Sequence, residues 1–206
     1  MRASVLLGMV GVLVLGASAM AVGLPNGNQF GPYTLQLSDV GAGFYKLRAA
    51  RAHSNARAIK EGTPAIIIRR FGRLGGYERD FEAKHFLKED LVAIGSTVVG
   101  TRTAAGAHSY FLWATKPSRI KRVAKGVTLH ALLRPRVGAE SRCYAFKNKI
   151  EGSAFLNFVC YWRQNRLLGS LFAAAFWARR LEVPLIVPFT QLTMMQARRM
   201  ASFSSR

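Results

Sequence analysis

The clearest pattern of apolar and polar positions lies in the C-terminal half of the chain. The segments 140–150, 154–163 and 166–177 each have the length and the apolar and aromatic content of a strand. Short connections separate them, with Glu151-Gly152 at the first and Gln164-Asn165 at the second, and both pairs suit a tight turn. The pattern therefore predicts a three-stranded antiparallel meander.

A second pair of strands is predicted in the middle of the chain. Residues 74–83 alternate between a side that carries Phe81 and an acidic side. A period of two predicts a strand with one face toward water. Residues 91–100 have the composition of its partner strand, and residues 85–90 would connect the two. The acidic, water-exposed side is formed by Glu78, Asp80 and Glu82.

The region before these strands has weaker signals. Residues 33–37 alternate and are followed by Ser38-Asp39, which predicts a short strand and a turn. Residues 44–48 favour a second short strand. Residues 49–61 contain helix formers and no proline, and Gly62 beyond them is a candidate C-cap, so this segment predicts an exposed helix.

Two helices and two ambiguous runs complete the central part of the chain. Thr103 is a suitable N-cap for a helix that runs from Ala104 to about Thr115. The basic stretch 118–125 favours a short helix. The apolar runs 66–68 and 127–133 fit a helix or a strand, and the pattern does not decide between them.

A last helix is predicted from about Val187-Pro188, with the proline at its first position, to about Ala201. Its apolar residues form an inner face made of Phe189, Leu192, Met195, Ala197 and Met200. Together the elements predict an α+β fold. It has a single antiparallel β-sheet with helices packed mainly on one face, and a C-terminal three-strand meander followed by a terminal helix.

The first residues change the picture, because they carry an export signal. Arg2 precedes 22 uncharged residues, which include the small-residue triplet Ala17-Ser18-Ala19. A basic start, an apolar stretch and such a triplet define a secretory signal peptide. We therefore predict a protein of the cell envelope, periplasm or extracellular space, cleaved near Ala19 or alternatively Ala21. The other interpretation is an uncleaved envelope protein anchored by residues 3–24, a length that just spans a bilayer.

The domain organisation follows from this signal. Residues 1–19 are the predicted signal peptide, and residues 20–32, rich in Gly, Pro and Asn, form a flexible lead-in. Residues 33–206 have the length of one α+β domain. Hydrophobic residues make up 50% of the chain, enough for a real core.

The two cysteines suggest a disulfide. If Glu151-Gly152 is a two-residue turn, Ile150 faces Ser153, and counting outward places Cys143 opposite Cys160. Opposed residues of an antiparallel pair have Cα atoms about 4.5–5.5 Å apart, which lies within disulfide range. Since an exported chain folds under oxidising conditions, we predict this bridge rather than two free thiols.

Charge is the outlier of the composition. The chain has 30 Lys and Arg against 10 Asp and Glu, a formal net charge of +20. This balance favours an anionic surface or polyanion as partner: anionic lipid, cell-surface polymer or an acidic protein. Nucleic acid is not an expected partner in this compartment, and a generally basic composition without an anionic partner is the alternative. The candidate binding residues are Arg69, Arg70, Arg73, Arg119, Lys121 and Arg122.

No catalytic signature accompanies this charge. The four histidines are dispersed without the spacing of metal ligands, so neither a metal nor a cofactor is expected. Ser118 and Lys121 match the Ser-x-x-Lys element of acyl-transfer enzymes, but its companion elements are absent. The leading hypothesis is therefore a non-enzymatic binding or accessory domain. The alternative is an extracytoplasmic hydrolase whose site is too scattered to identify from the sequence.

Loosely spaced motifs also point to an exported protein without an assigned activity. They include a Leu-x-x-x-Asp-Val-x-x-Gly-Phe opening, a Gly-Tyr-x-x-x-Phe strand and a Trp-Arg-x-x-Arg-Leu hairpin before a closing helix. With these motifs the chain resembles a diffuse group of exported bacterial proteins without an assigned activity. Similar exported α+β domains often act as sensor or lipid-associated modules, an analogy at the level of the fold. The matched segments are Leu35–Phe44, Gly76–Phe81, Ser96–Val98, Ala104–Phe111, Val137–Glu140, Trp162–Leu167 and Met194–Met200.

Overall fold

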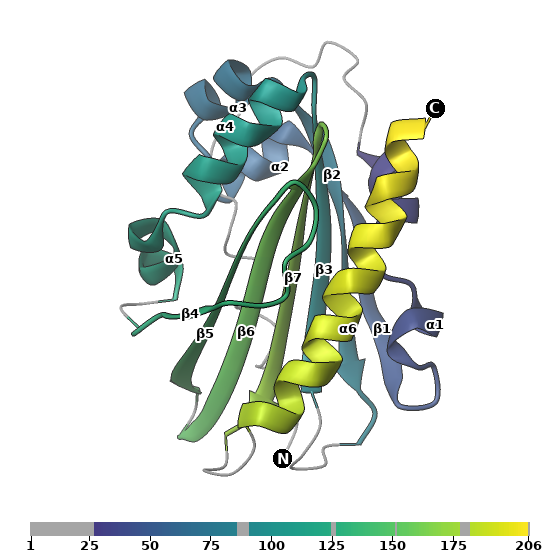
Figure 1. Ribbon diagram of the computed structural model, residues 1–206, viewed down its shortest axis with the longest axis vertical. Helices are drawn as coiled ribbons and strands as arrows, with labels where there is room; N and C mark the ends of the chain where they lie inside the picture. The colour runs from purple at the N-terminus through teal and green to yellow at the C-terminus, as the bar shows by residue number, and fades with distance from the viewer. Residues whose placement is uncertain (1–26, 86–90, 125–126, 151, 178–181, 206) are drawn as a thin grey trace.

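A seven-stranded antiparallel sheet organises the chain (Figure 1). The computed structural model describes residues 27–85, 91–124, 127–150, 152–177 and 182–205. Along the sheet the strand order is β1-β2-β3-β7-β6-β5-β4, so β1 and β4 form the edges. The strands are β1 Tyr45–His53, β2 Arg73–Ala83, β3 Leu91–Thr101, β4 His130–Leu132, β5 Glu140–Ile150, β6 Ser153–Gln164 and β7 Leu167–Phe176.

Helices cover both faces of this sheet. The long helix α6 crosses one face together with α1, and the shorter helices α2 to α5 gather on the other face (Figure 1). Helices α2 to α5 lie on one face, in agreement with the predicted packing of helices mainly on one face, and α1 and α6 cover the other face. The helices are α1 Leu37–Val40, α2 Asn55–Lys60, α3 Ala65–Phe71, α4 Ala104–Ala114, α5 Pro117–Val123 and α6 Glu182–Ala201, with 3-10 segments at Asn28–Tyr33 (η2) and Ser202–Ser205 (η3).

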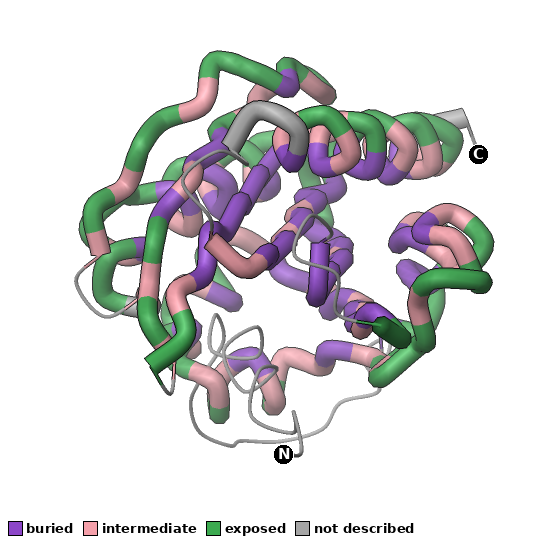
Figure 2. Tube along the Cα trace, turned by 90° about the horizontal axis from the view of Figure 1, so that it is seen from below, coloured by how far each residue is buried: buried purple, intermediate pink, exposed green. Residues whose placement is uncertain are grey.

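The main core lies between the sheet and α6. Alternate residues of β6 point to this side, among them the fully buried Trp162, whose partners include Met200 of α6. The rings of Phe158 and Phe189 stack with their centroids 5.3 Å apart. Figure 2 shows the buried side of α6 turned toward the sheet. The predicted inner face of the last helix is therefore confirmed.

A second core lies between the opposite face and α4. The intervening residues of β6, such as Val159 and Tyr161, pack here with Ala107 and Phe111. Helix α4 begins as predicted, because the Thr103 hydroxyl accepts a hydrogen bond of 3.0 Å from the Gly106 amide. Alternation along one strand thus feeds two cores, one on each face of the sheet.

The predicted meander and its register are confirmed. Ile150 pairs with Ser153 and Cys143 pairs with Cys160 across β5 and β6. The two cysteines form a disulfide, with their Cα atoms 4.0 Å apart. Both are buried in the core on the α6 side. The strands predicted at 74–83 and 91–100 are β2 and β3.

The segments before β2 differ from the expectation. Residues 33–37 form no strand, because Tyr33 ends η2 and Leu37 begins α1. The helix expected over 49–61 is strand β1 as far as His53, and only its second part is helical, as α2. Residues 28–32 of the predicted flexible lead-in belong to η2, where Phe30 is buried.

Several smaller expectations are settled as well. The run 66–68 lies in helix α3, and part of the run 127–133 forms strand β4. Helix α6 begins at Glu182 rather than near Val187, so Pro188 lies inside it. The predicted signal peptide and most of the connection at 85–90 lie outside the described residues. Among the described helices, none is long and apolar enough to cross a membrane.

Candidate functional site

Helices α3, α4 and α5 form a surface layer that is basic and free of acids. Residues 62–77 and 102–124, which include all three helices, contain no Asp or Glu. Close contact between α3 and α4 is possible because Gly106 has no side chain: a Cβ there would lie 2.3 Å from the Phe71 carbonyl oxygen. The exposed basic residues of this layer are Arg69, Arg70, Arg102, Lys116, Lys121 and Arg122.

Exposed apolar side chains accompany these charges. Ile66 of α3 is 59% exposed and Leu112 of α4 is 37% exposed. Arg119 is only half-exposed, because its guanidinium lies over the Trp113 ring at 3.6 Å from the ring centroid. Burial lowers the pKa of Arg119. The layer thus combines positive charge with protruding apolar groups.

Arg73 is a correction to the predicted binding residues. A binding residue has to be exposed, but Arg73 is 3% exposed and starts strand β2. Its guanidinium donates to Nδ1 of His53 at 2.7 Å and to Oδ1 of Asn55 at 2.6 Å. Burial lowers its pKa. Arg73 therefore organises the interior beneath α2 and cannot contact a partner.

His53 is held neutral by this arrangement. Because Nδ1 accepts from Arg73, the proton sits on Nε2, which donates to Oε2 of Glu61 at 2.5 Å. Burial, reinforced by the Arg73 charge, lowers the pKa of His53 to about 3. Both ring nitrogens are engaged, so neither is available to take a proton from a substrate.

The acidic side of β2 is buried, which corrects the expectation of a water-exposed face. Glu78 and Asp80 are 8% and 6% exposed. Glu78 accepts hydrogen bonds from Arg51 and Arg57, which extend over it from β1 and α2. Desolvation, with repulsion from Glu78, raises the pKa of Asp80 to about 6. The arginines expected on an exposed helix instead cover these carboxylates.

These two shifts make opposite contributions to stability. The raised pKa of Asp80 favours folding when this carboxyl is protonated, so its contribution is present below about pH 4 and is lost as pH rises through about 6. The lowered pKa of His53 means that the unfolded chain binds the extra proton, so stability is lost as pH falls below about 6.5. Between pH 4 and 6 the two effects offset each other.

We therefore expect Asp80→Asn to change the pH dependence of folding. Without the titration of Asp80, acidification from about pH 6 to 4 should lower the free energy of unfolding by on the order of 2 kcal/mol more than in the unaltered protein. Urea denaturation at several pH values measures this difference. Parallel pH curves for the two proteins would contradict the assignment.

A cavity of about 140 Å³ lies between the sheet and helices α4 and α5. Its floor includes one row of neighbouring residues on β2, β3, β7 and β6, paired in register. Its roof includes Tyr110 and Trp113, whose rings stack with centroids 5.4 Å apart. Most of the lining is apolar or aromatic. The row on the floor consists of Glu78, Thr97, Ser170 and Tyr161.

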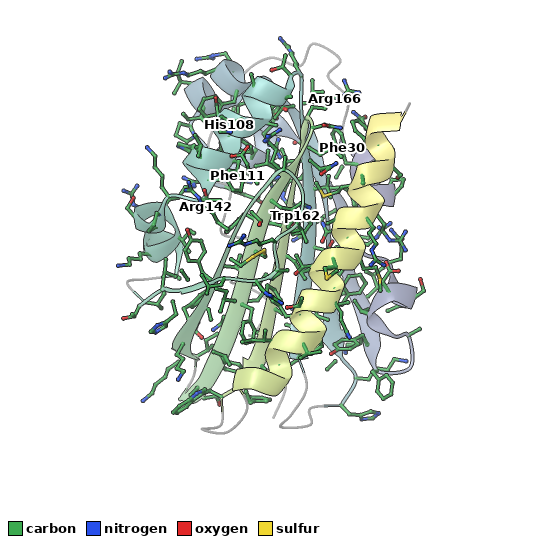
Figure 3. The ribbon with its side chains drawn as sticks, in the orientation of Figure 1. Phe30, His108, Phe111, Arg142, Trp162 and Arg166 are labelled. Atoms are coloured by element: carbon green, nitrogen blue, oxygen red, sulfur yellow. A yellow bond between two sulfur atoms is a disulfide. The ribbon has the colours of Figure 1, made fainter. Side chains whose placement is uncertain are left out.

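Further contacts join α4 to strands β5 and β6 beside the cavity. Figure 3 shows Phe111 of α4 beside Arg142 of β5, whose guanidinium lies 5.5 Å from the ring centroid. Nearby, His108 contacts Glu140 at 2.8 Å, and Arg163 donates to the same carboxylate at 2.5 Å. Burial of Tyr161, at the edge of the floor, raises its pKa. These contacts hold α4 over the sheet.

The residues considered for catalysis from the sequence do not meet in the cavity. Ser118 and Lys121 are both exposed on α5, away from the cavity lining. Ser170 does lie on the cavity floor, but the histidine of that cavity has both nitrogens engaged. Within the described part of the chain, no group of three His, Cys, Asp or Glu could hold a metal ion.

The cavity residues were missed by the sequence interpretation. Ser170 and Asn157 are polar residues within otherwise apolar strands, a signal that was available. What the sequence did not show is that strand order brings them to one face, since β7 and β3 are adjacent although more than 60 residues separate their paired positions Thr97 and Ser170. Of the predicted binding residues, Arg119 alone lines the cavity.

Comparisons with known proteins found a similar fold in a solved structure. No protein-family model matches the chain, and no curated protein matches it. Among solved structures it is similar to the extracellular domain of PknH from Mycobacterium tuberculosis, with a TM-score of 0.53 and 9% sequence identity. The match covers 86% of this chain and 100% of that one. At this identity the likeness shows a shared fold alone, and the resemblance to exported bacterial proteins stays a prediction.

Proposed function

We propose that this protein is an exported, non-enzymatic binding domain that docks on an anionic membrane surface through helices α3 to α5. The observation that carries the proposal is the acid-free basic layer on these helices. The export signal, the Cys143–Cys160 disulfide and a fold shared with an extracellular domain support the compartment. The engaged nitrogens of His53 support a binding rather than a catalytic role.

A membrane suits this surface better than a soluble polyanion or an acidic protein. Ile66 is exposed on α3, which carries Arg69 and Arg70, and Leu112 is exposed on α4, which packs against α3. Apolar side chains among positive charges are typical of segments that enter the headgroup region of a bilayer. A charged polymer offers no apolar phase for them. The combination therefore favours anionic lipid.

The expected strength follows from the number of exposed charges. Each Lys or Arg near an anionic leaflet contributes about 1 kcal/mol. Arg69, Arg70, Lys121 and Arg122 are exposed, so together they would supply on the order of 4 kcal/mol. This attraction is screened by salt, with a screening length of about 3 Å at 1 M ionic strength.

The double reversal Arg69→Glu and Arg70→Glu should therefore weaken vesicle binding by at least about tenfold. The test uses the protein recovered from the envelope or medium and vesicles of mixed phosphatidylcholine and phosphatidylglycerol, with co-sedimentation at low and high salt. Binding should fall steeply as salt rises. Vesicles of phosphatidylcholine alone should bind weakly.

A matched control separates a docking surface from general basicity. Lys149→Glu with Arg198→Glu makes the same change in net charge at exposed positions on β5 and α6, outside the proposed layer. Equal losses in the two double variants, or binding that is independent of salt, would refute the docking surface. Stronger binding to heparin or polyglutamate than to the vesicles would assign the surface to a polyanion instead.

A further inference from the structure

The cavity beneath α4 and α5 has no part in membrane docking, because it lies on the inner side of these helices. It lies between the β-sheet on one side and the stacked Tyr110 and Trp113 on the other. Its volume of about 140 Å³ is close to the ~150 Å³ of an engineered apolar cavity that binds benzene. This space therefore fits one six-membered ring or a group of similar size.

The charged groups at the rim select against an ion. Glu61 is engaged by His53 and Arg57, and Glu78 is engaged by Arg51 and Arg57. A ligand anion would lie close to these carboxylates. A ligand cation would compete with arginines that already pair with them. Arg119 also lines the cavity, and its guanidinium lies over the Trp113 ring. Because each of these charged groups already has a partner, the occupant that costs least to desolvate is neutral.

One polar group inside the cavity still lacks a partner. Asn157 is 3% exposed and lines the cavity from β6. Its Nδ2 donates to Oδ1 of Asn148 at 2.8 Å and to the carbonyls of Phe146 and Phe155 at 3.4 Å each. These bonds fix the orientation of the amide. Among the described residues, no donor reaches its Oδ1.

This oxygen is accessible within the cavity, and an acceptor that a bound ligand shields from water needs a donor from that ligand. Oδ1 of Asn157 can accept but cannot donate, so the group it recognises must bear an O–H or N–H. The hydroxyls of Thr97 and Ser170 lie on a row of the sheet four residues away from that of Asn157, so they do not share the ligand atom that Asn157 binds. The remaining lining, with Phe146, Phe172 and Tyr161, is aromatic.

We propose that this cavity is a binding site for a neutral, ring-sized apolar molecule with one hydrogen-bond donor, of the phenol or alcohol class, recognised by Asn157. The apolar body packs against the aromatic side chains of the sheet and of α4. The donor binds Oδ1 of Asn157. This site is independent of the membrane-docking surface.

Phenol is the probe that tests the proposal. Calorimetry and saturation-transfer NMR on the whole exported protein should show phenol binding about tenfold more tightly than benzene or anisole, which match its ring but cannot donate. Benzoate and benzylammonium should bind more weakly than phenol, because each adds a charge. Equal affinity for phenol and benzene would overturn the role of Asn157, and tighter binding of either ion would overturn the neutral class.

Two variants place the ligand. Asn157→Leu should remove the preference for phenol over benzene while benzene still binds. Val159→Phe adds volume to the lining and should abolish binding of both probes. If Asn157→Leu fails to fold, Val159→Phe decides alone, with near-ultraviolet circular dichroism as the check of folding. Undiminished phenol binding by a folded Val159→Phe protein would refute the site.

A last control separates this site from the docking surface. The Arg69→Glu and Arg70→Glu protein should bind phenol as the unaltered protein does, because neither residue lines the cavity. Loss of phenol binding in that variant would contradict the placement of the site beneath α4. Loss of vesicle binding alone leaves the phenol site intact.

Discussion

Replacing Cys143 and Cys160 together with alanine is expected to lower the free energy of unfolding by about 3 kcal/mol. The bridge joins residues 17 positions apart, so it restricts a loop in the unfolded chain that would otherwise move freely. Both sulfurs lie in the core between the sheet and α6, where alanine leaves no unpaired polar group. Urea denaturation of the two proteins measures the difference.

Reduction of the unaltered protein provides an independent check. Under a reductant that opens the bridge, its free energy of unfolding should approach that of the double alanine variant, whereas the variant should not respond to the reductant. A reductant effect of equal size on both proteins would show that the bridge is not its target. Two free thiols in air-exposed native protein would contradict the disulfide itself.

Trp162→Ala is expected to cost about 3–5 kcal/mol, the usual range for removing a buried large aromatic residue. The indole is fully buried and fills the space over Gly169, where a Cβ would lie 2.3 Å from its ring. Met200 of α6 reaches the same point. The loss should therefore loosen the packing of α6. The near-ultraviolet circular dichroism signal should weaken, and the midpoint of unfolding should fall.

Trp162→Phe is the matched comparison for this site. Within the described residues the indole Nε1 has no hydrogen-bond partner, so phenylalanine keeps most of the packing and loses no such bond. It should cost clearly less than alanine. Gly169→Ala should also destabilise, by about 1–3 kcal/mol, because the added methyl group has no space. A phenylalanine variant as unstable as the alanine variant would contradict this view of the contact.

The C-terminal half of the fold was predictable because local signals and tertiary structure agree there. Strand patterns in 140–177 are separated by turn residues, and Asn165 takes a positive φ of 51° at the second turn. Counting outward from the first turn was enough to pair the cysteines. Register is strongly fixed in this part of the sheet, because a slip by one residue would exchange the two cores.

The segments before β2 were not predictable from local preference. Ala49 to Ala52 favour a helix by composition, but the arginines on β1 pair with carboxylates of β2, and these contacts prevail. The environment of Leu35 was not predictable either. This residue is fully buried, and its amide donates to the Ser96 hydroxyl at 2.9 Å. A partner 61 residues away leaves no trace in a local pattern.

In the candidate site, too, some residues were predictable from the sequence and others were not. The basic residues of α3 and α5 were identified from composition, and most of them are exposed as expected. Arg73 is buried instead, because it lies at the start of strand β2, which α2 covers. Predicting the cavity would have required the strand order, because its lining comes from β2, β3, β5, β6 and β7 and from α4 and α5. No spacing in the sequence groups these residues.

The contact between the two ends of the described chain sets an order of events during folding. Phe203 packs edge-on against Tyr33 with ring centroids 5.0 Å apart, and Arg199 pairs with Asp39 at 2.6 Å. Asp39 and Arg199 are separated by 160 positions in the sequence, and such distant contacts form slowly. During synthesis from the N-terminus, η2 is available long before its partner α6. This part of the main core can therefore close only once α6 has followed.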